Sequence, residues 1–158
     1  MMMKLPQFKN FLQMLLLVSG LSAGLAWAQE QGTPAEAKAM VQRTIDSMKK
    51  NGIDSTVADI NKKDGKYQDR DLYIVVYDIN GKNLAHINPK MIGKDLTDLK
   101  DADGKYFVRE RIELVKKKGS GWQDYKFVNP VSKQIEPKSM YVEKYEGVIV
   151  GCGVYKKE

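Results

Sequence analysis

The stretch that decides the fold is Leu72-Tyr73-Ile74-Val75-Val76-Tyr77-Asp78-Ile79. It is rich in β-branched and aromatic residues and has almost no polar face, which predicts a central strand covered on both sides. Asn80-Gly81 follows at once and is a strong signal for a tight hairpin turn. Residues 83–87 then return as a second strand, which Asn88-Pro89 ends. The sequence therefore predicts an antiparallel hairpin in the middle of the chain.

Two helices are expected before this hairpin. Thr33 can cap a helix, Pro34 fits its first turn and Glu36 completes a capping box. The apolar residues that follow recur at helical spacing, which predicts one amphipathic helix over about 34–50. A weaker second helix is expected over 55–61.

One helix and three strands are expected after the hairpin. The helix covers about 104–117, and the strands cover 121–128, 140–145 and 148–155. Short links between the strands imply antiparallel pairing. The predicted fold class is therefore α+β, with an antiparallel sheet of about five strands and helices on one side of it.

The last predicted strand alternates in a way that leaves an open question. Val148 and every second residue after it share one face, while Gly151, Gly153 and Tyr155 share the other. Two glycines on one face of a strand leave room for a close approach. Either a packed helix or a bound ligand could use that room.

The first residues resemble a secretory signal peptide. Lys4 and Lys9 precede an apolar run over about 11–25, and Ala26-Trp27-Ala28 supplies small residues at the two positions that a signal peptidase reads. Cleavage after Ala28 would leave one domain over 29–158. An uncleaved membrane anchor is the alternative. The bacterial periplasm is the expected location.

Composition argues against several functions. The chain has 158 residues, a net charge of +6 and no dense basic stripe, so nucleic-acid binding is not expected. It has one histidine, His86, and one cysteine, Cys152, which excludes an internal disulfide and leaves no metal-ligand cluster. There is no P-loop, haem-attachment or nucleophile-elbow motif. We therefore expect no catalytic residue, no metal and no cofactor, and we do not expect an enzyme.

The C-terminal half does hold an aromatic and basic cluster. It consists of Trp122, Tyr125, Phe127, Lys138 and Tyr141. Tyrosine hydroxyls and an ammonium group on an apolar wall suit a small carboxylate, although the same aromatic residues could simply be core. In one regular strand Lys138 and Tyr141 would face opposite ways, so both reach one pocket only if residues 137–139 are bent or precede the strand.

Several segments together resemble a single Cache domain, a PAS-like extracytoplasmic sensor family. Together they span about 34–156. The segments are 71–78, Asn80-Gly81-Lys82, Leu84-Ala85-His86, Gly93-Lys94-Asp95-Leu96, 101–107, Gly121-Trp122 with Tyr125, Asn129-Pro130, Pro137-Lys138 with Tyr141, and 151–155. The resemblance implies a PAS-like antiparallel sheet flanked by a long N-terminal helix. It also implies the ligand-sensing part of a chemoreceptor or sensor kinase, in which small carboxylates and similar metabolites bind beside the sheet.

The resemblance also implies roles for particular residues. Lys138 and Tyr141 would be polar anchors, and Tyr125 and His86 secondary hydrogen-bonding groups. Three further residues would be walls: Tyr73, Phe107 and Trp122.

The resemblance extends to no second transmembrane helix or signalling segment of the kind that the usual receptor has, so we expect none here. We therefore expect a stand-alone secreted binding protein that acts in signal transduction, with its bound state read by a membrane-bound receptor or sensor kinase. A periplasmic interaction or scaffold subunit with no small ligand is the alternative.

Overall fold

A computed structural model describes residues 31–156, so the expected signal peptide over 1–28 lies outside the described residues. The elements, in chain order, are α1 (Pro34–Asn51), α2 (Ile53–Lys62), β1 (Gln68–Asp69), β2 (Leu72–Asp78), β3 (Asn83–Ala85), a 3-10 helix (Pro89–Met91), α3 (Phe107–Lys118), β4 (Ser120–Val128), β5 (Ile135–Tyr145) and β6 (Val148–Tyr155). Within these residues no helix is long and apolar enough to cross a membrane.

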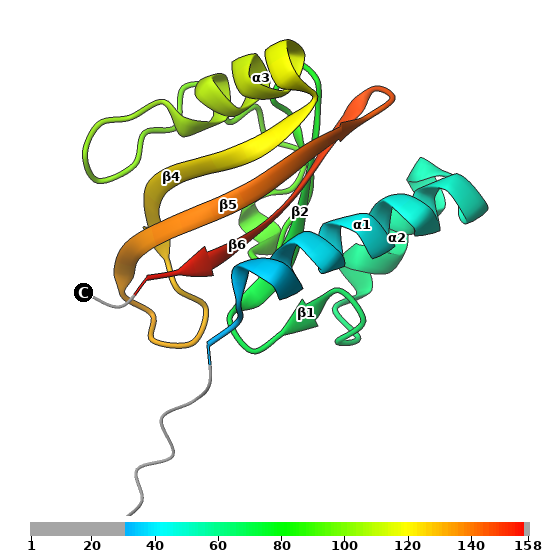
Figure 1. Cartoon of the computed structure of the whole chain (residues 1–158), viewed down its shortest axis with the longest axis horizontal. Coiled ribbons are helices and arrows are strands. Elements are labelled where there is room, and N and C mark those ends of the chain that lie inside the picture. The colour runs from blue at the N-terminus through cyan, green and yellow to red at the C-terminus, as the bar shows by residue number, and fades with distance from the viewer. Residues whose placement is uncertain (1–30, 157–158) are drawn as a thin grey trace, which may run out of the picture.

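The strands form one antiparallel sheet in the order β1-β2-β6-β5-β4, and β3 pairs with β2 beside this path (Figure 1). β6 lies between β2 and β5, so the last strand of the chain sits in the middle of the sheet. The predicted α+β class and antiparallel sheet are confirmed. The sheet has six strands where about five were expected, because the two-residue β1 carries too little sequence to show a pattern.

The helices cover both faces of the sheet, so the expectation that they lie on one side was wrong. The buried side chains of α1 pack against one face of the sheet, with Ile74 of β2 and Val150 of β6. The buried side chains of α3 pack against the opposite face, with Tyr73 and Ile149. Alternation along each strand gives the sheet two apolar faces, and each face needs its own cover.

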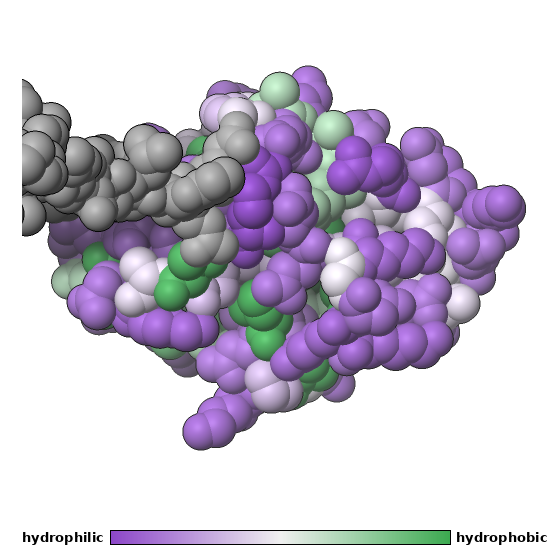
Figure 2. All heavy atoms as spheres, turned by 90° about the horizontal axis from the view of Figure 1, so that it is seen from below, coloured by the Kyte–Doolittle hydropathy of each residue, from purple (hydrophilic) through white to green (hydrophobic). Residues whose placement is uncertain are grey.

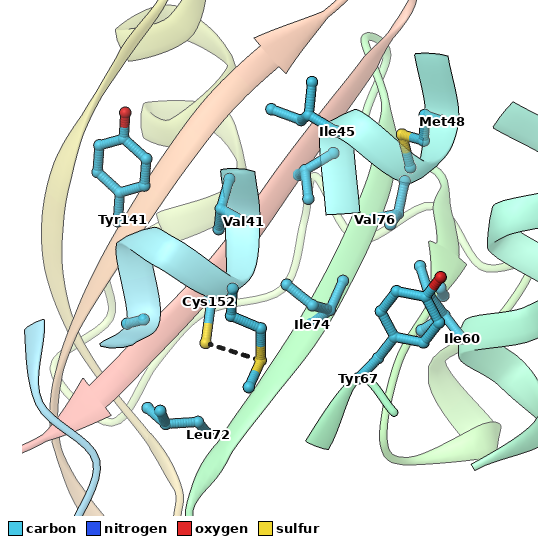
Figure 3. Packing of buried hydrophobic residues seen from close by; sticks show 14 of the residues in the cluster. Val41, Ile45, Met48, Ile60, Tyr67, Leu72, Ile74, Val76, Tyr141 and Cys152 are labelled. Atoms are coloured by element: carbon cyan, nitrogen blue, oxygen red, sulfur yellow. Dashed lines mark hydrogen bonds between the residues drawn. The ribbon is translucent and has the colours of Figure 1, made fainter. Parts of the chain in front are cut away.

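The start of α1 forms as the sequence predicts. The Thr33 hydroxyl accepts a hydrogen bond from the backbone N–H of Glu36, and the Glu36 carboxylate accepts one from the backbone N–H of Thr33. This capping box satisfies amide groups that the first turn leaves free. Figure 3 shows Val41, Ile45 and Met48 of the helix directed at the sheet.

β5 begins at Ile135, five residues before the strand that the sequence predicted there. Pro137 discouraged an earlier start, because proline cannot donate a hydrogen bond to a neighbouring strand. In the structure, Pro137 pairs with Lys126 of β4, and its carbonyl oxygen accepts a hydrogen bond from the backbone N–H of Lys156 at 2.9 Å, so the strand continues through the proline although Pro137 donates no bond itself. β5 is therefore one continuous strand through the region where a bend was considered.

The outer surface carries few large apolar side chains. The most exposed among the described residues are Tyr106, Trp122, Val128, Val131 and Ile135. The face seen from below in Figure 2 is mostly hydrophilic, and its hydrophobic residues show in separate places between polar ones. Scattered apolar residues of this kind are ordinary for a protein surface. The apolar material of this chain is mostly in the two core layers on either side of the sheet.

Candidate ligand-binding site

Lys138 of β5 is buried on the α3 face of the sheet, with 1% of its surface exposed. Its Nζ donates a hydrogen bond to the Tyr155 hydroxyl at 3.1 Å and lies 4.0 Å from the centre of the Tyr73 ring. Among the described residues it has no carboxylate within ion-pair distance. Burial lowers the pKa of Lys138 to about 7. The site therefore contains a buried amino group that forms no direct ion pair with an acidic side chain of the described residues.

Gly153 makes room for this lysine. A Cβ atom at Gly153 would lie 2.4 Å from Lys138 Cε and 3.1 Å from the Ser139 carbonyl oxygen. At Gly151 a Cβ atom would lie 3.0 Å from Met140 Sδ. The close approach that the two glycines permit is therefore made by side chains of β5, rather than by a helix.

We expect Gly153→Ala to destabilise the protein by about 1–3 kcal/mol, since the added methyl group would overpack the lysine stem and the Ser139 carbonyl. Gly147→Ala is the matched control, because nothing lies within 4 Å of a Cβ atom there. Urea unfolding of the two variants measures the difference. Equal stability of the two variants would show that the space over Gly153 is not needed.

Aromatic rings surround Lys138 on the same face. Phe107 stacks on Tyr125 at 4.8 Å between ring centres, and Phe127 meets both rings at 5.9 Å. Tyr73 and Phe127 also contact His86, at 5.6 and 5.9 Å between ring centres. β2, β4, α3 and the segment after β3 thus each contribute a ring to one apolar wall.

His86 is held as a neutral hydrogen-bond donor. Its Nδ1 accepts a hydrogen bond from the backbone N–H of Asn88 at 2.9 Å, which leaves Nε2 to carry the proton of the neutral ring. Burial lowers the pKa of His86 to about 3, and the charges of Lys138 and Arg111 act in the same direction. The ring is therefore uncharged at neutral pH.

A cavity of about 450 Å³ opens beside this wall. Tyr73, His86 and Phe127 line it, together with apolar residues that include Met91 and Leu99. Lys100 and Lys133 also line it, and these two cations would attract an anion to the opening. A concave apolar site with a few polar groups is the usual form of a small-molecule pocket.

The structure brings five of the seven predicted site residues together on the α3 face. They are Lys138, Tyr125, His86, Tyr73 and Phe107. Strand alternation places Lys138, Tyr125 and Tyr73 on this face, whereas Phe107 reaches it from α3 and His86 from the segment after β3.

The other two, Tyr141 and Trp122, lie on the opposite face. Tyr141 packs in the α1 core, as Figure 3 shows, and its hydroxyl donates to Glu143 at 2.8 Å. Trp122 contacts the Tyr141 ring at 5.5 Å and is 41% exposed. β5 is a regular strand through Lys138 and Tyr141, so their side chains point to opposite sides and the placement of both in one pocket was wrong.

Two residues of the site were missed. Tyr155 holds the amino group of Lys138, and its hydroxyl donates to the Val128 carbonyl at 2.7 Å. The alternation of the last strand already placed it beside Gly151 and Gly153. Arg111 is buried among the rings, and its signal was a charged residue within the apolar stripe of α3. Within the part of the chain described, no group of acidic, histidine or cysteine residues could hold a metal ion.

The model of the family described as Single Cache domain 2 matches residues 8–158. The chain belongs to this family. The recognition from sequence and the PAS-like architecture are therefore confirmed.

Known relatives of this Cache domain are sensor regions of chemotaxis receptors. The methyl-accepting chemotaxis protein McpP of Pseudomonas putida is 30% identical over 90 residues, which are 55% of this chain and 16% of that receptor. A chemotaxis protein structure from Vibrio parahaemolyticus superposes with a TM-score of 0.66 at 24% identity, covering 77% of this chain and 86% of that one. That likeness establishes the fold.

Two further solved structures are slightly more similar in sequence to this chain than the Vibrio structure is. One, described as a periplasmic sensor domain of a chemotaxis protein, has a TM-score of 0.60 at 26% identity over 78% of this chain and 90% of its own. The other, a Cache chemosensory domain whose description concerns carboxylic acid recognition, has a TM-score of 0.62 at 25% identity over 78% of this chain and 88% of its own. The two neighbours are thus described as sensor domains of the kind found in chemotaxis proteins.

Proposed function

We propose that this Cache domain is a non-catalytic periplasmic sensor that binds a small carboxylate on the α3 face of its sheet, with Lys138 as the anchor. The observation that carries the proposal is the buried Lys138 amino group, which has no carboxylate within ion-pair distance among residues 31–156. Burying an unpaired charge is unfavourable by several kcal/mol, and a ligand carboxylate would remove that penalty. The bound state would be read by a membrane-bound receptor or sensor kinase.

The groups at the site favour an anion over other ligands. Lys138 and the Nε2 of His86 offer N–H donors, and the nearby rings offer apolar surface for a short carbon skeleton. A carboxylate only accepts hydrogen bonds, so it suits a site that mainly donates them. The Cache neighbour whose description concerns carboxylic acid recognition supports the same ligand class.

The first experiment measures the melting temperature of the purified protein against a panel of short carboxylic acids. A ligand at about a hundred times its dissociation constant adds roughly 2.7 kcal/mol to the free energy of unfolding. For a domain of this size that is a rise of roughly 2–8 °C. Acetamide is the matched control for acetate, since it has the same shape without the charge, and we expect it to have no effect.

A shift with acetamide equal to that with acetate would contradict anion recognition. No shift with any acid would instead favour the interaction or scaffold function, in which the same rings serve only as core. Capture of the protein by a membrane complex would then be the observation to seek.

Export is tested separately. When the full chain is produced in a bacterial host, we expect the protein to appear in the periplasm and to begin at Gln29, as cleavage after Ala28 requires. Mass spectrometry of the intact periplasmic protein measures this directly. A protein that keeps residues 1–28 and stays with the membrane would instead support an uncleaved anchor.

A further inference from the structure

The exposed apolar side chains of this Cache domain are concentrated on one hairpin. Of the five most exposed among the described residues, only Tyr106 lies elsewhere. Trp122 and Val128 are on β4, Ile135 is on β5, and Val131 is in the turn between these strands. Val128 and Ile135 are direct neighbours across the strand pair, and 45% and 62% of their surfaces are exposed. Single exposed apolar residues are ordinary, but several on one element mark an interaction surface.

Three of these side chains lie on the side of the sheet that carries α1. β4 and β5 pair without a register shift, so alternate residues of β4 keep to one face. Trp122 lies opposite Tyr141, which packs in the α1 core, so Trp122 and Val128 face that side, as does Ile135 opposite Val128. We call this surface of the two strands the β4–β5 face. Trp122 and Val128 mark its ends, about 20 Å apart at about 3.3 Å per residue.

The helices leave the β4–β5 face open. α1 lies along β6 and also contacts β2 and β5, while α2 lies beside α1 and contacts β3. In Figure 1, β4 is on the far side of β5 from α1. A helix is about 10 Å wide and neighbouring strands are about 4.8 Å apart, so one helix covers about two strands. β4 and the adjoining side of β5 therefore leave space for one more helix beside α1.

The outer edge of β4 is poorly suited to the addition of another strand. The backbone N–H of Lys126 donates a hydrogen bond to Asp101 Oδ2 at 3.1 Å. The carbonyl oxygen of Asp124 accepts one from Lys105 Nζ at 2.8 Å. Strand addition requires such edge groups to be free. A partner would therefore dock on the face of the two strands rather than on their edge.

Polar side chains on the β4–β5 face already have internal partners. The Asp124 carboxylate accepts a hydrogen bond from Ser139 and pairs with Lys156 at 3.0 Å. The Glu143 carboxylate accepts a hydrogen bond from the Tyr141 hydroxyl at 2.8 Å. A docking segment can cover these groups without leaving a buried polar atom unpaired. The exposed apolar side chains are then the main source of binding free energy.

Lys38 of α1 borders the β4–β5 face and gives it a preference for charge. Its Nζ lies 5.4 Å from the centre of the Tyr141 ring. Among the described residues no carboxylate is within ion-pair distance of Lys38. An acidic side chain on the flank of a docking helix would pair with this cation and fix the orientation of the helix.

The helices of a second copy of this chain do not offer a matching apolar stripe. The exposed sides of the two longer helices carry charged residues, which include Arg43 and Asp46 on α1 and Arg109 and Glu113 on α3. An apolar helix over the β4–β5 face must therefore come from another protein.

The same hairpin borders the ligand cavity. Val128, Pro130 and Lys133 line that cavity, and Val128 also ends the β4–β5 face. The carbonyl oxygen of Val128 accepts a hydrogen bond from the Tyr155 hydroxyl at 2.7 Å. A helix seated on the β4–β5 face would thus contact residues that also border the cavity, so that docking and ligand binding can affect one another.

We propose that the β4–β5 face docks an amphipathic helix of a membrane-bound partner. An apolar stripe of the helix lies over Trp122, Val128 and Ile135, and an acidic residue on its flank lies beside Lys38. A stripe about 20 Å long needs about 13 residues of helix, since a helix rises about 1.5 Å per residue. This inference rests on the proposed function only in assigning to the partner the response to the bound state.

The test is photo-crosslinking of the full chain in its native cells, with Trp122 or Ile135 replaced by p-benzoylphenylalanine. Mass spectrometry of the irradiated products locates the partner residues. Both positions are expected to label one segment of one membrane-anchored protein, at sites roughly 13 residues apart. Tyr106, replaced in the same way, is the matched control, because it is an exposed aromatic residue at the start of α3 and is expected to give no such product.

A fluorescent peptide copied from the crosslinked segment then measures affinity. Trp122→Ser is expected to weaken binding by at least about 30-fold, as for a central aromatic residue of an interface. Lys38→Glu is expected to weaken it by about fivefold, as for an exposed charge pair. Tyr106→Ser is expected to change nothing. These side chains are exposed, so each variant should keep the wild-type melting temperature. Wild-type affinity in Trp122→Ser would overturn the docking face.

The crosslinked positions also identify the kind of partner. Sites about six residues apart would indicate an extended strand, since a strand rises about 3.3 Å per residue. Crosslinks to another copy of this chain would indicate self-association. Either result overturns the proposal, as does labelling of lipid alone or of no molecule.

The outcomes also distinguish this proposal from the proposed function. If both positions label a helix as expected although no acid shifts the melting temperature, the docking face stands and carboxylate binding fails. If an acid binds and neither position gives a crosslink, carboxylate binding stands and the docking face fails.

Discussion

Lys138→Met is expected to weaken carboxylate binding by about 100-fold or more. In this variant, a ligand carboxylate bound on the α3 face would have no charged partner. Removing one member of a buried charge pair costs about 2–5 kcal/mol of binding free energy. Methionine matches the unbranched stem of lysine and fits the space over Gly153, so the variant isolates the charge. Calorimetric titration with the acid that shifts the wild-type melting temperature most measures the loss.

Two controls show whether the loss is specific. Lys144→Met changes another lysine of β5 that is exposed, and it is expected to leave affinity unchanged. Tyr141→Phe removes the hydroxyl that donates to Glu143 on the opposite face, and it too is expected to leave affinity unchanged. Binding by Lys138→Met that equals wild type would remove Lys138 from the site. If Tyr141→Phe weakened binding as much as Lys138→Met, the result would support the placement of Tyr141 and Lys138 in one pocket that the sequence suggested.

Carboxylate affinity is expected to fall as pH rises above about 7, by up to tenfold per pH unit. The reason is that the anion binds the protonated amino group of Lys138, whose pKa burial lowers to about 7. Below about pH 7 the group is already charged and affinity should be nearly constant. Titrations in buffers of different ionisation enthalpy, at about pH 8, should reveal a proton taken up with each ligand. Affinity that is flat up to about pH 9 would show that the amino group is not the anchor.

Stability of the ligand-free protein should change with pH in the opposite direction. Lys138 has a lower pKa in the folded protein than its ordinary 10.5, so the unfolded chain binds more protons between these values. The free energy of unfolding should therefore rise with pH from about 7 to about 10, by at most about 1.4 kcal/mol per pH unit. Urea unfolding of wild type and Lys138→Met should diverge over this range, with the variant lacking the Lys138 contribution.

Other groups near Lys138 titrate outside this window. The pKa of His86 is lowered to about 3 by burial, and the pKa of Cys152 is raised to about 12. The pKa values of Tyr73 and Tyr155 are raised above their usual range by burial, and Arg111 stays charged. Asp71 acts on Lys138 through its charge, and one of its oxygens accepts from the Gly32 N–H at 2.7 Å. Lys138 is therefore the group whose proton should govern binding around neutral pH.

The site could be anticipated only as far as strand alternation reaches. Tyr73 and Tyr125 fell on one face because alternation within β2 and β4 is regular. Lys138 and Tyr141 were joined in one pocket by family resemblance, although their odd separation already argued against it. A bend at Pro137 would have brought the two side chains to one face. Whether such a bend forms depends on where β6 ends beside β5, which the local sequence pattern does not predict.

The sequence by itself determined the three helices, the longer strands and their order. Local signals sufficed for this, namely the capping box at Thr33, the apolar run of β2, the turn at Asn80-Gly81 and the alternation of β6. Only the tertiary structure decided which faces the helices cover and which side chains meet. Arg111 and Lys138 come from a helix and a strand, and only the packed structure buries both cations beside the rings of one face, with no carboxylate of the described residues within ion-pair distance. Burial and the absence of a partner are properties of the packed molecule, because they depend on what every other segment places nearby.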